Sequence, residues 1–145
     1  MSIPTEIITD KSLSQKGFYW REKEGVKVLV CAPLEQAGFT NGFSTRLGGV
    51  SAFPENSLNL AGYDEDSAAN IEENRKRFLK VFEGEWRIAS CWQTHSDLVR
   101  QVKTLEDAAD GNHKMDALIS DVKNVLLGAK TADCVPVLLG DPKTG

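Results

Sequence analysis

The first apolar positions of the chain fall into two short runs of strand-forming residues separated by a polar turn. The runs are Phe18-Tyr19-Trp20 and Val26-Lys27-Val28-Leu29-Val30-Cys31, and Lys23-Glu24-Gly25 lies between them. Aromatic and β-branched residues favour strands, and a short turn containing glycine joins antiparallel ones. The pattern predicts a hairpin, followed by a third strand near residues 38–46 that is broken at Asn41-Gly42.

A helical stripe of apolar residues follows between residues 67 and 82. Ser67 is of a type that caps helix N-termini, and Gly84 closes the segment. Acidic residues precede the helix and basic residues lie in its second half, as the helix dipole favours. The stripe is Ala68, Ile71, Phe78, Leu79 and Phe82, the acids are Asp64, Glu65 and Asp66, and the bases are Lys76, Arg77 and Lys80.

Short strand-like runs dominate the rest of the chain. They cover residues 87–95, 98–102, 117–120, 125–131 and 134–139. Groups of strands around one long helix are typical of the α+β class rather than of an alternating βαβ chain. No repeat or linker divides the sequence, so we expect residues 1–145 to lie in a single domain of mixed β-sheets flanked by helices.

Composition excludes several classes of protein. Apolar residues make up 41% and charged residues 26% of the 145 positions, as in ordinary globular proteins. The net charge of -4 argues against nucleic acid as a partner. No run approaches the roughly 18 apolar residues of a membrane span, and the opening residues lack a secretory leader pattern. We therefore expect a cytoplasmic protein without a membrane partner, whose cysteines are reduced because they lack CxxC spacing.

Two segments carry residues suited to chemistry. If residues 90–95 form a strand, its alternation places Cys91, Gln93 and His95 on one face. In the second segment, residues 130–136, a polar stretch with Cys134 interrupts two apolar runs, and Pro136 removes a backbone donor, so the chain is expected to bend there. Taken alone, each has an ordinary structural interpretation: a histidine at a strand end bonded to backbone, and a small buried thiol.

Arg46 and Asn74 are candidate substrate-binding residues. Arg46 lies beside Gly48-Gly49, whose freedom permits a tight turn and close backbone approach, and its guanidinium suits phosphate or, equally, an ordinary salt bridge. Asn74 faces inward with the helical stripe. Its preferred interpretation is structural, an amide that ties the helix to a neighbouring strand or loop, and Asp116 is interpreted in the same way.

Six ordered blocks resemble the YfiH/YlmD family, also called the laccase-domain or multicopper polyphenol oxidase family. The resemblance spans residues 43–141, and the N-terminal forty residues contribute little to it. The blocks are Ser44-Thr45-Arg46-Leu47-Gly48-Gly49-Val50-Ser51, Ser57-Leu58-Asn59-Leu60, Glu73-Asn74-Arg75, Gln93-Thr94-His95, Asp116-Ala117-Leu118 and Thr131-Ala132-Asp133-Cys134-Val135-Pro136-Val137-Leu138.

This resemblance implies a YfiH-like fold and a metal site. In that family the ligands are the histidine of Gln-x-His, the cysteine of Thr-Ala-Asp-Cys and a histidine in a later His-Ala-Gly-Trp-Arg-Gly block. His95 and Cys134 are thereby implied as metal ligands and catalytic residues. The third block is absent, so the third ligand would lie beyond residue 145 and the fold would be incomplete at its C-terminus. Ser96 and Ala61 stand where the family usually has glycine.

The implied activities are phosphorolysis of purine nucleosides, adenosine, inosine or methylthioadenosine, and deamination of adenosine. A thiolate with two imidazoles suits zinc, with copper as the alternative, and leaves one coordination position open. Zinc-activated water would serve deamination. Arg46 is the best candidate for orthophosphate, with Asn74 beside it in the proposed substrate-binding set. Because the chain supplies only His95 and Cys134, we expect it to bind metal weakly and to be inactive alone.

Three rival interpretations stay open. The first is a copper-dependent polyphenol oxidase. The second is a noncatalytic interaction module in which Arg46, Asn74 and Cys134 serve packing only. The third is cysteine-nucleophile chemistry, with Cys134 as thiolate and His95 as its base. Oligomeric state and the preferred nucleoside are left open by the sequence.

Overall fold

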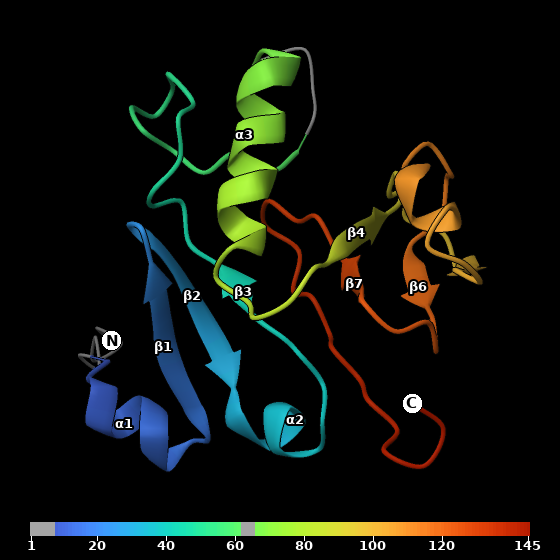
Figure 1. The fold of residues 1–145 in the computed structure, drawn as a ribbon, viewed down its shortest axis with the longest axis horizontal. Helices are drawn as coiled ribbons and strands as arrows, with labels where there is room; N and C mark the ends of the chain where they lie inside the picture. The colour runs from blue at the N-terminus through green and yellow to red at the C-terminus, as the bar shows by residue number, and fades with distance from the viewer. Residues whose placement is uncertain (1–7, 62–65) are drawn as a thin grey trace, which may run out of the picture.

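The structure is a computed structural model that describes residues 8–61 and 66–145 (Figure 1). Its helices are α1 (Asp10–Gln15), α2 (Ala32–Gln36), α3 (Ala68–Leu79) and the 3-10 turn η1 (Asp107–Ala109). Its strands are β1 (Phe18–Lys23), β2 (Val26–Cys31), β3 (Phe43–Ser44), β4 (Arg87–Ser90), β5 (Val99–Gln101), β6 (Ala117–Ile119) and β7 (Val125–Gly128). The predicted α+β class is confirmed. Within the described ranges, no helix has the length and apolar character needed to cross a membrane.

The predicted hairpin is confirmed as β1 and β2, which pair antiparallel with Trp20 opposite Leu29. Glu24 and Gly25 both have positive φ, 51° and 82°, as a two-residue hairpin turn requires. Alternate residues of β2 face inward, and Val26, Val28 and Val30 are completely buried. They form the centre of one core cluster together with Leu58, Val81 and Phe82.

The third strand is shorter than predicted. The sequence pattern indicated residues 38–46, whereas β3 contains only Phe43 and Ser44. The physical reason is Asn41, whose side chain forms hydrogen bonds with the backbone of β2. Its Oδ1 accepts the N–H of Cys31 at 2.8 Å and its Nδ2 donates to the carbonyl of Cys31 at 3.1 Å. The Asn41 side chain thus replaces the backbone hydrogen bonds that a longer third strand would make with Cys31.

Helix α3 begins at the predicted cap and ends three residues earlier than predicted. Ser67 Oγ accepts the N–H of Asn70 at 3.1 Å, and regular helix stops at Leu79. The chain beyond it still packs inward, because Val81 and Phe82 are buried in the first core. Asp64 and Glu65, expected at the N-terminal end, lie outside the described residues. The short helices α1 and α2 had no counterpart among the predicted elements.

Two small parallel sheets form the second part of the fold. Strand β4 pairs with β7, from Arg87 opposite Val125 to Ser90 opposite Gly128. Strand β5 pairs with β6 in the same parallel sense. A second core cluster of Ala89, Val102 and Ala108 lies among them, with Leu118, Val125 and Leu127 packed against it.

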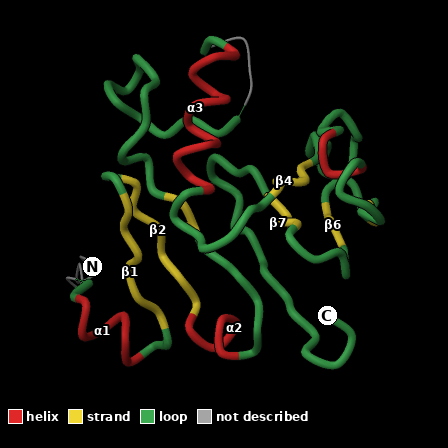
Figure 2. Tube along the Cα trace, in the orientation of Figure 1, coloured by secondary structure: helices red, strands yellow, loops and turns green. Residues whose placement is uncertain are grey.

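The predicted strands are wrong in extent around the two polar segments that follow β4 and β7. Strand β4 ends at Ser90 rather than residue 95, and β7 ends at Gly128 rather than residue 131. Residues 134–139, predicted as a strand, form no strand and are drawn as loop in Figure 2. Pro136 has no N–H to donate, and no described strand lies alongside this segment to pair with it. The predicted bend is confirmed at Ala132–Cys134.

Candidate functional site

A polar pocket of about 270 Å³ lies where the segments following β4 and β7 meet. Adjacent parallel strands end at the same edge of a sheet, so the chain leaving each strand enters the same region. The segment after β4 contributes Cys91, Gln93 and His95 to the lining, and the segment after β7 contributes Lys130, Thr131, Ala132, Asp133 and Cys134. The topology thereby brings together the two residues implied as ligands, His95 and Cys134.

Cys91, Gln93 and His95 lie together as predicted, although the strand that was expected to place them on one face does not extend to them. All of them line the pocket, but β4 ends before Cys91. Extended pairing continues only as an isolated bridge between Trp92 and Lys114. His95 has a φ of 57°, a left-handed conformation that turns the chain away from strand geometry.

A carboxylate holds the His95 turn in place. Asp116 accepts the backbone N–H groups of Thr94 at 3.3 Å, His95 at 2.8 Å and Ser96 at 2.8 Å. The hydroxyl of Ser96 also donates to it at 2.6 Å. These bonds, the Ser96 hydroxyl foremost, lower the pKa of Asp116 to about 2. Ser96, a departure from the family's usual glycine, therefore adds a bond to the turn, and the structural interpretation of Asp116 is confirmed.

The thiols on this side of the molecule differ in environment. Cys134 is exposed, and the Nε2 of Gln93 donates to its sulfur at 3.8 Å. Cys91 is buried, and this burial raises the pKa of its thiol. Burial opposes the charged thiolate form of Cys91. Cys134 is therefore the thiol in this pocket available to a metal or an electrophile.

Arg46 lies outside the pocket. Its side chain is exposed, and it is absent from the lining residues. The close approach expected at Gly48-Gly49 occurs, but to the chain's own backbone. A Cβ on Gly49 would lie 1.9 Å from the carbonyl oxygen of Ser57, and one on Gly48 would lie 2.5 Å from Gly25. The turn is filled by protein rather than open to a ligand.

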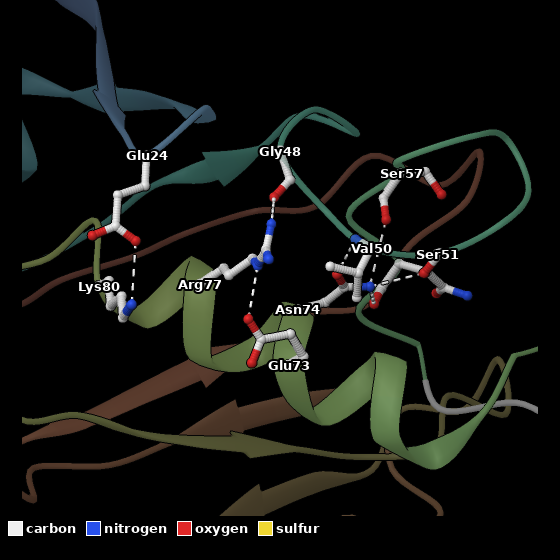
Figure 3. Close-up of polar contacts among 10 residues, drawn as sticks. Glu24, Gly48, Val50, Ser51, Ser57, Glu73, Asn74, Arg77 and Lys80 are labelled. Atoms are coloured by element: carbon white, nitrogen blue, oxygen red, sulfur yellow. Dashed lines mark hydrogen bonds and ion pairs between the residues drawn. The ribbon is translucent and has the colours of Figure 1, made fainter.

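Asn74 is completely buried and ties α3 to the loop at residues 50–59 (Figure 3). Its Oδ1 accepts the N–H of Val50 at 2.9 Å, and its Nδ2 donates to Ser51 Oγ at 2.8 Å and to the carbonyl of Asn59 at 2.9 Å. The structural interpretation of Asn74 is thus confirmed. Like Arg46, Asn74 does not line the pocket.

Lys130 is a pocket residue that sequence reasoning missed. It is half-buried, and this burial, followed by the charge of Arg75, lowers the pKa of its ammonium group. No alternating pattern marks Lys130, because Thr131, Ala132, Asp133 and Cys134 beside it line the pocket as well.

His95 and Cys134 do not make a complete metal site by themselves. Among residues 8–61 and 66–145, no cluster of three or more histidine, cysteine or acidic side chains is arranged to hold a metal ion. An imidazole and a thiol are donors of a kind that zinc and copper accept, but structural and catalytic zinc sites use at least about three protein ligands. The donor set is right in type and incomplete in number.

Comparison with known protein families decides the relationship. The family described as multi-copper polyphenol oxidoreductase laccase matches residues 40–145. The chain belongs to this family. A Staphylococcus aureus relative named purine nucleoside phosphorylase YlmD is 33% identical over 120 residues, which cover 75% of this chain and 44% of the relative. A purine nucleoside phosphorylase of Streptomyces coelicolor is 37% identical over 108 residues, covering 72% and 43% respectively.

Solved structures agree with the family assignment. The Bacillus licheniformis protein YfiH superposes with a TM-score of 0.60 at 25% identity, covering 74% of this chain and 43% of that one. The Neisseria meningitidis protein NMB0706 gives a TM-score of 0.53 at 26% identity, covering 81% and 43%. The predicted YfiH-like fold is confirmed. The chain spans less than half the length of the relatives it matches.

Proposed function

We propose that this chain contributes His95 and Cys134 to the active site of a metal-assisted purine nucleoside phosphorylase. The observation that carries the proposal is that both side chains line one pocket. The reaction is suggested by the names of the family relatives in Staphylococcus aureus and Streptomyces coelicolor. The proposed substrates are a purine nucleoside and orthophosphate.

The proposed reaction is displacement at C1′ of the ribose. An oxygen of orthophosphate forms a bond to C1′ while the bond from C1′ to N9 breaks, and the bonding electron pair leaves with the purine, which takes up a proton. The products are ribose 1-phosphate and the free base. Catalysis requires the reactants to be held in line and the departing negative charge to be stabilised. Hydrolytic deamination of adenosine is a second proposed activity: the oxygen of water forms a bond to C6, the bond from C6 to the amine nitrogen breaks, and ammonia leaves with inosine as the other product.

The chain's own contribution is to position two donors. Asp116 fixes the backbone on which His95 stands, and Gln93 fixes the sulfur of Cys134. Zinc bound by these donors and a further ligand would activate water, whose pKa falls to about 7 on catalytic zinc. We propose that the further ligand is a histidine supplied by the remainder of a family domain. By the same reasoning, the 145-residue chain alone is inactive.

A second candidate function is a copper-dependent polyphenol oxidase. The family's description as a multi-copper oxidoreductase favours it. Copper accepts the same donors as zinc and exceeds zinc in divalent affinity. The two candidates differ in which metal accompanies the purified protein and in whether adenine release depends on phosphate.

A fusion tests both candidates. Residues 1–145 are joined to the part of the Staphylococcus aureus relative that follows the matched region, and metal content, phosphate-dependent adenine release and inosine formation are measured. We expect zinc and nucleoside turnover, loss of both in Cys134→Ala, and retention of both in Cys31→Ala, a thiol outside the pocket. Stoichiometric copper with phenol oxidation and no nucleoside turnover would favour the oxidase. A folded fusion with neither activity would rule out both.

A further inference from the structure

The pocket that holds His95 and Cys134 also has a lysine in its lining. Lys130 lines the pocket from the segment after β7. Arg75, from α3, lies close enough to Lys130 for its charge to lower the pKa of the lysine ammonium. Lys130 is therefore a half-buried cation in the pocket lining, and it also feels the charge of a cation from an element far away in sequence.

Among the described residues, neither cation has an acidic side chain as an ion-pair partner. Within residues 8–61 and 66–145, Lys130 has no ion pair or hydrogen bond, and Arg75 Nη2 donates only to the carbonyls of Leu60 at 3.4 Å and Ala61 at 3.2 Å. Asp133 lines the same pocket but is not among the charges that perturb Lys130, which are those of Arg75 and Cys91.

Such an arrangement has an electrostatic cost that an anion removes. Burying an ammonium group without a counter-charge is unfavourable, and a second cation nearby adds repulsion. A polyvalent oxyanion in the pocket offsets both effects and accepts hydrogen bonds from lysine and from guanidinium N–H groups. Phosphate would supply negative charge and acceptor oxygens to the ammonium group of Lys130.

We propose that Lys130 forms the orthophosphate subsite of this pocket. The inference rests on the proposed function for the identity of the anion, and it assigns phosphate to residues other than Arg46. Arg46 is exposed and outside the lining, while Lys130 stands on the same segment as Cys134. Phosphate held there lies within the pocket where the nucleoside would meet the His95 and Cys134 donors.

Titration of the 145-residue chain with inorganic phosphate at constant ionic strength, followed by calorimetry, tests the subsite directly. We expect saturable binding that Lys130→Met weakens by about tenfold or more and Lys130→Arg preserves within about threefold, because charge-assisted bonds to the anion are retained by arginine. Lys143→Met, at an exposed lysine outside the pocket, is the matched control and leaves affinity unchanged. Equal thermal midpoints of the variants show that Lys130→Met is folded.

Absence of saturable binding, or wild-type affinity in Lys130→Met, overturns the subsite. The fusion described above separates this failure from failure of the proposed function. In the fusion, Lys130→Met should raise KM for phosphate and leave KM for the nucleoside unchanged. Phosphate binding at Lys130 without nucleoside turnover would support the subsite and reject the phosphorylase. Nucleoside turnover with an unaltered phosphate KM in Lys130→Met would support the phosphorylase and reject the subsite.

Discussion

The carboxylate of Asp116 accepts the backbone N–H of His95 at 2.8 Å, joining the start of β6 to the turn that follows β4. The same carboxylate accepts the N–H groups of Thr94 and Ser96. His95 itself has a left-handed φ of 57°, a conformation that a non-glycine residue keeps only when its surroundings fix it. Asp116 is thus a positioning residue for the histidine donor.

Replacing Asp116 by asparagine should loosen the His95 turn. It should also abolish the loss of folding stability that protonation of Asp116 causes below about pH 3.8. The pKa of Asp116 falls from its ordinary 3.8 to about 2, so its contribution to stability is complete above pH 3.8 and is lost as pH falls towards 2. We expect hydrogen-exchange protection of the His95 amide to fall by about tenfold in Asp116→Asn at pH 6. Asp121→Asn, an exposed control, should retain wild-type protection. Undiminished His95 protection in Asp116→Asn would contradict the positioning role.

Replacing Asn74 by alanine should destabilise the whole fold. The change removes the partner of the Val50 N–H and of the Asn59 carbonyl, and we expect the free energy of unfolding to fall by about 2–4 kcal/mol. Urea denaturation measures this. Glu72→Ala, which removes only an exposed ion pair with Lys76 on the same helix, is the control and should cost less than about 0.5 kcal/mol. Equal losses would mean that Asn74 is not a structural tie.

Sequence reasoning succeeded where a local pattern determines local structure. The β1–β2 hairpin follows from its turn residues, and α3 begins at Ser67 because its hydroxyl caps the helix. It failed where a residue or strand distant in the sequence determines the local structure. The third strand is cut short by the side chain of Asn41, and residues 134–139 carry a strand pattern but have no neighbouring strand in the described chain.

The candidate site was predicted in part for the same reason. The ordered blocks identified His95 and Cys134, and the parallel pairing of β4 with β7 brings them to one pocket. The blocks also suggested Arg46, which is exposed and lies outside the pocket lining. Lys130 escaped notice because its significance depends on Arg75, a residue on another element whose proximity no local pattern reveals.

Substituting Gly49 by alanine should be far more damaging than the same change at Gly38. A Cβ on Gly49 would lie 1.9 Å from the carbonyl oxygen of Ser57, so backbone must move. A Cβ on Gly38 meets nothing within 4 Å, although its φ of 94° is unfavourable for alanine. We expect losses of about 3 kcal/mol or more for Gly49→Ala and about 1–2 kcal/mol for Gly38→Ala by urea denaturation. Equal losses would show that the Gly49 turn relaxes freely.

A thiol reagent should distinguish the cysteines by their environments. Cys134 is exposed and Cys91 is buried with a raised thiol pKa, so we expect Cys134 to react first at pH 7.5 and Cys91 last. Mass spectrometry of the labelled peptides gives the order, with half-buried Cys31 as internal reference. In the fusion, zinc should protect Cys134 and leave Cys31 unaffected. Labelling of Cys134 that zinc does not slow would instead favour the cysteine-nucleophile interpretation.

Residues 134–139 expose several apolar side chains. Val135, Val137 and Leu139 are 88%, 73% and 92% exposed, an alternating apolar row on a segment without strand partners among the described residues. Exposed apolar rows of this kind mark surfaces that another part of a structure covers. Because the chain spans less than half the length of its relatives, we expect the remainder of a family domain to cover this row.

Val137→Asp tests that expectation by comparing two proteins. In the 145-residue chain it should change the free energy of unfolding by less than about 0.5 kcal/mol, because the side chain is already exposed. In the fusion with the Staphylococcus aureus relative it should cost about 2 kcal/mol or more, because the carboxylate would then be buried without a partner. Lys143→Asp, at an exposed position in the turn that follows the segment, is the control and should be neutral in both. A large loss in the 145-residue chain would show that Val137 already packs against its own fold, and no loss in the fusion would leave the row uncovered.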